Sequence, residues 1–163
     1  MPDALMLSMS FQQYDEFLRT NKLSKDKNMD AIVKRVGRKI QKGVEEYFSL
    51  KNRSYELNDY KWEFNLVENQ QVNAWCMPGG KVVVYTGILK VTDDEDTLAV
   101  VIAHEIAHAV AKHGNERMSH GLLAQMGGIA LSNALKEKPA ATKKLWMSVF
   151  GLGAQFGVIL PYS

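Results

Sequence analysis

The sequence predicts an α+β domain, with several helices around a small antiparallel or mixed sheet of about three strands. Three observations predict it. One long segment keeps the apolar period of an amphipathic helix, a later segment alternates as strands do, and a third segment forms a helix with almost no polar face. With 163 residues, 46% hydrophobic and 23% charged, we expect one folded domain over residues 1–163.

The N-terminal third is predicted to be helical. Ser10-Phe11-Gln12-Gln13 has the spacing of a capping box, and apolar residues follow at helical intervals in a short helix that ends near Asn21. A long amphipathic helix is predicted from Asp26 to Leu50, because apolar side chains recur there every three or four residues. They are Met29, Ile32, Val33, Val36, Ile40, Val44 and Phe48.

The middle of the chain is predicted to form the sheet. Apolar and polar residues alternate from Trp62 to Leu66, as in a half-buried strand. A second strand is predicted from Gln71 to Met77, and the turn at residues 78–80 (Pro-Gly-Gly) leads into the β-branched run Lys81–Tyr85. The last two segments should therefore pair as a hairpin.

Three further helices are predicted in the C-terminal half. The first runs from a capping box at residues 92–95 (Thr-Asp-Asp-Glu) to Gly114, which favours a left-handed stop. The others cover Arg117 to Leu135 and Ala141 to Val158, and Pro139 separates them. The apolar stretch at residues 145–160 is shorter than the ~20 residues of a membrane span, so it indicates a buried helix, with peripheral membrane contact as the alternative.

Charge and cysteine content exclude some classes of function. The formal net charge is +2, and the basic stretch from Lys22 to Lys42 also contains acidic residues, so it is typical of a solvated helix face and we expect no nucleic-acid partner. Cys76 is the only cysteine, which excludes an intramolecular disulfide and a thiolate metal cluster. The N-terminus lacks the pattern of a secretory signal, so the protein is either cytoplasmic or has lost a targeting segment.

The candidate catalytic motif is His-Glu-Ile-Ala-His at residues 104–108, within the predicted apolar helix. His104 and His108 are one helical turn apart, so both imidazoles can reach one tetrahedral metal ion at ~2.0–2.1 Å. Glu105 stands beside that position, where it can take a proton from an activated water and pass it to a leaving amine. Zinc fits such a site because it favours imidazole nitrogen and can leave one position open. The alternative is two core histidines with a paired glutamate, but the buried helix behind a hairpin favours a zinc site.

A third metal ligand is not evident. The metzincin pattern would need glycine at Ala111 and histidine at Gly114, and neither is present. A glutamate from elsewhere is the usual alternative, as in sites with two histidines and one glutamate. Glu116 lies too near the helix end to fold back, and Glu137 lies in a Lys-Glu-Lys stretch typical of solvated residues. His113 is predicted to point away from the metal, and His120 has no assigned role.

Two segments carry a resemblance to a known family. Residues 73–89, NAWCMPGGKVVVYTGIL, and residues 104–119, HEIAHAVAKHGNERMS, resemble the HtpX-like and CAAX-prenyl-endopeptidase family of zinc metallopeptidases. The similarity runs from about residue 10 to the end, and it is strongest to soluble, cell-envelope bacterial members. It implies a zincin-like fold and one zinc ion. Residues 160–163, Leu-Pro-Tyr-Ser, resemble the family segment that leads into a helix carrying a glutamate ligand, so the third ligand is expected to lie beyond this chain.

The resemblance also implies a substrate site and a location. The strand with Asn73, Ala74 and Trp75 would be the edge that binds a polypeptide substrate, a role that main-chain hydrogen bonds can perform with little sequence preference. The alternative is a plain core strand with Trp75 buried. We expect a location in the bacterial cell envelope or periplasm, with a membrane anchor outside this chain.

Two functions follow as hypotheses. The first is a zinc endopeptidase that acts on unfolded or misfolded envelope proteins, with Glu105 as general base and then acid. The second is a peptide-binding or chaperone-like module that performs no hydrolysis, because the third ligand is missing. Self-association is also expected, since removing a helix beside the metal should expose apolar surface between Leu122 and Leu160.

Overall fold

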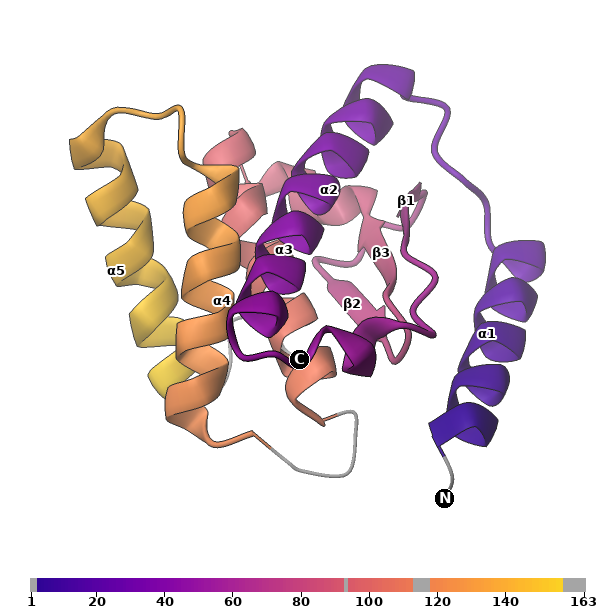
Figure 1. Ribbon diagram of the computed structural model, residues 1–163. Coiled ribbons are helices and arrows are strands. Elements are labelled where there is room, and N and C mark those ends of the chain that lie inside the picture. Colours follow the sequence, from indigo (N-terminus) through magenta and orange to yellow (C-terminus); the bar gives the residue numbers. More distant parts are fainter. Residues whose placement is uncertain (1–2, 93, 113–117, 157–163) are drawn as a thin grey trace.

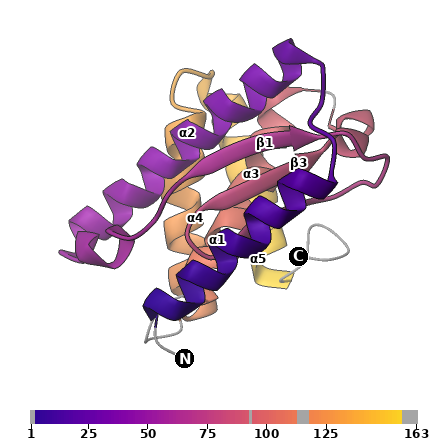
Figure 2. The same ribbon diagram turned by 90° about the vertical axis from the view of Figure 1, so that its right-hand side faces the viewer.

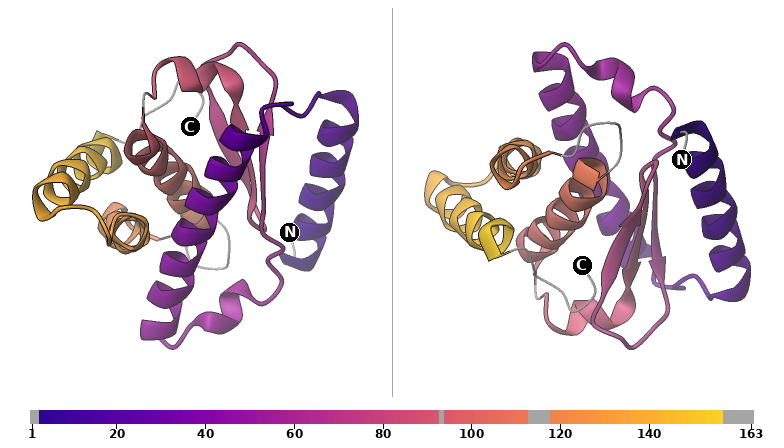
Figure 3. Two further views of the ribbon diagram at one scale, coloured as in Figure 1. Left: turned by 90° about the horizontal axis from the view of Figure 1, so that it is seen from above. Right: turned by 90° about the horizontal axis from the view of Figure 1, so that it is seen from below.

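The computed structural model describes residues 3–92, 94–112 and 118–156. In these ranges the elements are α1 (Asp3–Thr20), α2 (Lys27–Leu50), η1 (Ser54–Leu57), β1 (Glu63–Val67), β2 (Ala74–Met77), β3 (Lys81–Tyr85), η2 (Thr86–Lys90), α3 (Glu95–Lys112), α4 (His120–Ala134) and α5 (Ala140–Phe156). They form layers, with α1 on one face of the sheet, α2 and α3 on the other, and α4 and α5 outermost (Figures 1 and 3). The α+β fold class predicted from the sequence is confirmed.

Within the described ranges the sheet has three strands in the order β1-β3-β2 and is mixed. β2 and β3 pair antiparallel, with Trp75 opposite Val83, so the predicted hairpin is confirmed. β1 runs parallel to β3. Gly79 and Gly80 form the turn with φ values of 93° and 89°, a region that glycine enters without steric cost. β2 therefore lies at an edge of the sheet.

The predicted start of the second strand at Gln71 is wrong by three residues. β2 begins at Ala74, because the preceding residues are held in a loop. The Asn69 side chain accepts a hydrogen bond from the Gln71 amide at 2.9 Å, and the Asn69 carbonyl accepts one from the Gly87 amide at 2.8 Å. Local side-chain bonding of this kind competes with strand pairing.

Each face of the sheet packs in a separate core. The larger core lies between the sheet and the helices α2, α3, α4 and α5. The smaller core lies between the opposite face and α1 (Figure 2). The smaller core consists of Tyr14, Val67, Val83 and Tyr85, with Phe17, Leu18, Trp75 and Met77 packed against them. Side chains that alternate along one strand thus enter different cores, as the two-residue period of a strand requires.

The long amphipathic helix is confirmed as α2. Its N-cap is Asp26, whose side chain accepts a hydrogen bond from the Met29 amide. The predicted apolar face is buried from Val33 to Phe48, while Met29 and Ile32 are partly buried. Gly43 brings α2 close to α4, since a Cβ built on it would lie 2.4 Å from the Ala130 Cα.

The first helix was predicted too short. α1 begins at Asp3, and Ser10 lies in its interior rather than at a cap. The Ser10 hydroxyl donates instead to the Pro78 carbonyl at 2.7 Å, in the turn of the hairpin. Leu7, Ser10 and Tyr14 are buried, so the same face of the helix contacts the sheet over several turns.

The predicted start of the helix that carries the His-Glu-Ile-Ala-His motif is also displaced. The Thr92 hydroxyl donates to the Ile88 carbonyl at 3.1 Å, so it does not cap the helix. Asp94 takes that role, and its carboxylate accepts a hydrogen bond from the Thr97 amide at 2.8 Å. α3 therefore begins at Glu95, and the predicted stop at Gly114 lies outside the described residues.

The two C-terminal helices form a pair across α3 (Figure 1). α4 begins at His120, with Ser119 as its N-cap, so its described start lies three residues after the predicted one at Arg117. α5 begins next to Pro139 as predicted, and the predicted end at Val158 lies outside the described residues.

Candidate active site

The His-Glu-x-x-His motif lies in the middle of α3, surrounded by other elements. His104 is 0% exposed and Glu105 is 5% exposed, while His108 is partly buried. α3 contacts α2, α4, α5 and β2, which explains why apolar residues cover nearly its whole circumference. The two polar side chains in that interior therefore need a specific partner, since burial without one is costly.

The structure brings the two histidines together. Their Nε2 atoms are 3.2 Å apart, and their ring centroids are 4.4 Å apart. Two imidazoles bound to one tetrahedral zinc at ~2.0–2.1 Å would have nitrogen atoms about 3.3–3.4 Å apart, from the tetrahedral angle. The pair thus fits a metal ion with little adjustment. A hydrogen bond between the rings would give a similar distance, so this distance alone does not distinguish metal binding from hydrogen bonding. The groups around the two rings must decide between these possibilities.

His108 is suited to offer a lone pair at neutral pH. Its pKa is lowered from 6.5 to about 4, mainly by burial and then by the nearby His104, Lys112 and His120, in that order. A metal ligand must be the neutral imidazole, so a depressed pKa keeps His108 in the form that binds metal.

Glu105 lies beside the histidine pair, and its carboxylate makes no hydrogen bond to a residue that the structure describes. Its Oε1 atom and the His104 Nδ1 atom are both buried with no partner among the described residues. The two atoms are 3.9 Å apart, which is too long for a hydrogen bond. Buried polar atoms are satisfied in the great majority of structures, so unpaired ones in one place indicate that a bound group or water completes the site.

Cys76 is a neighbour of the site that sequence reasoning did not identify. Burial raises the pKa of its thiol, and the Glu105 carboxylate raises it further. Cys76 therefore lies on the side of β2 that faces α3, close enough to Glu105 to respond to its charge. The alternation of side chains along β2 could have indicated this position, because Cys76 lies on the same face of the strand as Ala74.

Phe150 and Gly127 hold α3 from the side of the C-terminal helices. The Phe150 ring meets the His104 ring edge to face, with centroids 6.3 Å apart, and is 1% exposed. A Cβ at Gly127 would lie 2.2 Å from the Phe150 ring and 3.1 Å from the Ala107 Cβ. The missing side chain thus makes room for the ring that packs on His104.

The predicted substrate strand lies next to α3, but its side chains face two ways. Ala74 packs in the larger core on the α3 side. Trp75 packs in the smaller core, where its indole donates to the Tyr85 hydroxyl at 3.2 Å. Asn73 is buried, and its side chain accepts a hydrogen bond from the Ala74 amide at 2.9 Å. A substrate role for this strand would therefore use its main chain and not the Trp75 indole.

No third metal ligand is found in the described ranges. Among residues 3–92, 94–112 and 118–156, no group of three His, Cys, Asp or Glu side chains is arranged to hold a metal. His113 and Glu116 lie outside these ranges. Glu137 lines a different pocket, and His120 is exposed at the start of α4. His104 and His108 would thus be two ligands of a site that needs another.

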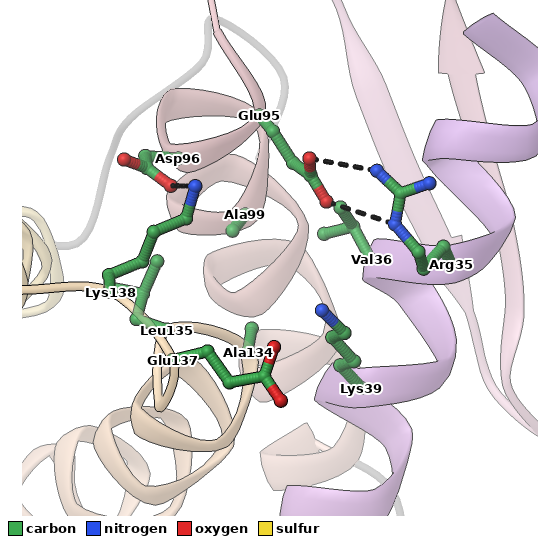
Figure 4. Close-up of a pocket in the computed structure, with 10 residues that line it drawn as sticks. All are labelled: Arg35, Val36, Lys39, Glu95, Asp96, Ala99, Ala134, Leu135, Glu137 and Lys138. Carbon is green, nitrogen blue, oxygen red and sulfur yellow. Dashed lines mark hydrogen bonds and ion pairs between the residues drawn. The ribbon is translucent and has the colours of Figure 1, made fainter. Parts of the chain in front are cut away.

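The pocket that contains Glu137 lies at the N-terminal end of α3 and has a volume of about 260 Å³ (Figure 4). Its charged groups pair largely with one another. Arg35 makes two hydrogen bonds to the Glu95 carboxylate, at 3.2 and 2.8 Å, and Lys138 lies 3.4 Å from Asp96. These pairs connect α2 to α3 and α3 to the loop before α5, so they support the scaffold.

A buried helix carrying His-Glu-x-x-His, beside the edge strand of a small sheet, is the arrangement of a metallopeptidase. Comparison with known proteins agrees. The sequence profile of Peptidase family M48 matches residues 34–163. The chain belongs to peptidase family M48.

Several curated proteins are similar to part of this chain. The mitochondrial metalloendopeptidase OMA1 of Schizosaccharomyces pombe is 46% identical over 63 residues, which are 39% of this chain and 19% of that protein. The metalloendopeptidase OMA1 of Homo sapiens is 36% identical over 78 residues, 47% of this chain and 15% of the relative. The β-barrel assembly-enhancing protease of Yersinia pestis is 32% identical over 90 residues, 55% of this chain and 15% of the relative. The matched segments thus span less than a quarter of each relative.

Among the helices that the structure describes, none combines the length and apolar character that crossing a membrane requires.

Proposed function

We propose that this chain carries the catalytic helix of a zinc-dependent endopeptidase that hydrolyses unfolded or misfolded proteins of the cell envelope. One observation carries the proposal. The Nε2 atoms of His104 and His108 meet at 3.2 Å, beside a buried Glu105 carboxylate that lacks a partner among the described residues. Two imidazoles and one adjacent carboxylate would supply two of the metal ligands and the general base that metal-assisted peptide hydrolysis uses.

Each residue has a distinct role in this proposal. His104 and His108 hold zinc through their Nε2 atoms, and a third ligand comes from outside the described residues. Bound zinc supplies a Lewis acid that polarises the scissile carbonyl and activates water. Glu105 accepts a proton from the attacking water at its carboxylate and delivers it to the leaving amine. The buried position of Glu105 keeps competing water away from this transfer.

The open edge of β2 is the proposed binding site for the substrate backbone. The Asn73 carbonyl accepts a hydrogen bond from the Tyr85 amide at 3.1 Å. This bond determines which residues of β2 direct their main-chain groups toward β3. The main-chain groups of Trp75 and Met77 then face β3, and those of Ala74 and Cys76 face outward. The Ala74 amide is bonded to the Asn73 side chain. The Ala74 carbonyl, the Cys76 amide and the Cys76 carbonyl have no backbone partner among the described residues, so we propose that they pair with an extended peptide.

The other edge of the sheet is less available. Residues 22–24 run along the C-terminal half of β1, where the Ser24 amide donates to the Leu66 carbonyl at 2.9 Å and the Glu68 amide donates to the Lys22 carbonyl at 2.8 Å. A peptide that adds to the sheet would thus find β2 more open, and β2 is the strand that contacts α3. The more open edge strand is thus also the strand next to the helix that carries Glu105. This arrangement supports cleavage of a peptide that is bound to β2.

Similarity supports a finer placement within family M48. Residues 73–89 and 104–119 favour the HtpX-like group, and we propose that the chain belongs to it. The name of the Yersinia pestis relative connects that protein with β-barrel assembly, which supports a cell-envelope location here. A membrane anchor outside the described residues remains part of this proposal.

The test is Glu105→Gln in the full-length protein, with β-casein as an unfolded substrate and zinc content measured in parallel. We expect cleavage to fall by about 10²–10⁴-fold with zinc retained, because only the proton transfer is removed. Glu137→Gln is the matched control and should cleave normally, since Glu137 is exposed in the distant pocket. Undiminished cleavage by Glu105→Gln would contradict its role. Binding of casein without cleavage by the unmodified protein would favour the non-hydrolytic module.

A further inference from the structure

The N-terminal helix α1 lies outside the segment that matches family M48, yet it covers the sheet. The family match begins at Lys34, after α1 has ended at Thr20. α1 lies across the face of the sheet opposite α3, so the sheet is enclosed between the two helices (Figures 2 and 3).

α1 contacts the β2–β3 hairpin at three places, which are β2, the turn and β3. The Phe17 ring meets the Trp75 ring edge to face, with centroids 4.9 Å apart. The Ser10 hydroxyl donates to the Pro78 carbonyl at 2.7 Å. The Phe11 ring lies 4.9 Å from the ammonium group of Lys81, a side chain that is only 6% exposed. The hairpin is therefore held at three separate positions from one side.

These contacts act on the strand that the proposed function assigns to substrate. Trp75 lies between Ala74 and Cys76, whose main-chain groups face the open edge and whose side chains face α3. β2 has only four residues and is paired on one side, and a short two-stranded hairpin is marginally stable alone. Packing of α1 behind Trp75 is thus a restraint on β2 from the face opposite α3, in addition to the pairing with β3 and the contact with α3.

We infer that α1 is a positioning element for the substrate-binding edge, with Phe17 and Ser10 as its positioning residues. This inference rests on the proposed function of β2. It means that the N-terminal helix adjusts substrate affinity without contacting the metal ligands. Displacing α1 would loosen the hairpin and weaken substrate binding, while His104, His108 and Glu105 keep their geometry.

The experiment compares Phe17→Ala with Met9→Ala in the full-length zinc-loaded protein. Phe17 faces Trp75, whereas Met9 is 41% exposed and lies on the same helix, so the pair separates positioning from helix stability. For Phe17→Ala we expect the KM for β-casein to rise about three- to tenfold, the size of the loss of one aromatic ring pair, with kcat and zinc content unchanged. Hydrogen exchange of the Trp75 amide, which faces β3, should accelerate by a similar factor. Met9→Ala should leave all four quantities unchanged.

Each outcome decides the inference. Unchanged KM and unchanged exchange in folded Phe17→Ala would overturn it, and so would a joint fall of kcat and zinc content. If Phe17→Ala does not fold, Ser10→Ala removes only the hydrogen bond to the turn, and the same shift in KM and exchange is expected. If the unmodified protein does not cleave casein, the proposed function fails. Hydrogen exchange of the hairpin then still decides whether α1 holds the strand.

Discussion

Replacing Gly43 by alanine tests the helix crossing that supports the active-site layer. A Cβ at Gly43 would lie 2.4 Å from the Ala130 Cα and 3.2 Å from the amide nitrogen and carbonyl carbon of the same residue. Carbon atoms in contact are ordinarily about 3.5–4.0 Å apart, so α2 and α4 would have to separate by roughly 1 Å. Neither helix can relieve this contact by rotating a side chain, because the atoms belong to the backbone of α4.

The magnitude follows from two opposing effects. Overpacking costs about 1–3 kcal/mol, and removing a glycine from a helix returns about 1 kcal/mol. Since the contact is with backbone, the cost should lie at the upper end of that range, and we expect a net loss of about 2 kcal/mol in the free energy of unfolding. For a chain of this size, that loss lowers Tm by about 4–8 °C. Urea denaturation followed by circular dichroism measures the free energy directly.

Two further variants separate this explanation from a general intolerance of substitution. Gly151→Ala in α5 has no atom within 4 Å of the new Cβ, so it should leave stability unchanged or raise it by up to about 1 kcal/mol. Adding Ala130→Gly to Gly43→Ala should not restore stability, because the Ala130 Cα remains in place. A Gly43→Ala protein as stable as the unmodified one would refute the reasoning.

Four other predictions follow from the site and the scaffold. His108→Ala should lower zinc affinity with little loss of stability, because the side chain is only partly buried; calorimetric titration with zinc measures this. Cys76 should react with iodoacetamide at pH 8 about tenfold more slowly than in urea, because its raised pKa keeps the thiol protonated in the folded protein. A double-mutant cycle on Arg35 and Glu95 should give a coupling of about 0.5–1 kcal/mol that salt reduces, because both side chains are partly exposed. Leu145 is 58% exposed on α5, so Leu145→Glu should reduce any self-association seen by light scattering, and a monomer at high concentration would contradict the predicted association.

Elements with strong periodicity could be predicted from the sequence. The helix from Asp26 to Leu50 and the hairpin around Gly79 were found because apolar spacing and turn chemistry are local properties. The ends of the elements were predicted less accurately. Thr92 and Asp94 both have cap chemistry, and only tertiary contacts decided that the Thr92 hydroxyl bonds to Ile88 while Asp94 caps α3.

The arrangement of the site depended on contacts that spacing does not encode. The one-turn separation of His104 and His108 predicted that their rings could meet, and the structure places their Nε2 atoms together. The proximity of Cys76 to Glu105 depends on how β2 lies against α3, which periodicity does not specify. The packing partner of Trp75 likewise depends on α1, because the apolar spacing of that helix predicts a buried face but not the element that it covers.

The strip of main chain at residues 22–24, which runs along β1, also limits how copies of this protein could join. Strand-to-strand joining of molecules continues into a fibre only when both sides of each sheet accept a neighbour. Here one side is partly covered, so two copies that met through their β2 strands would each have used the more accessible side. Such a pair would have twofold symmetry and would resist growing further into a ribbon.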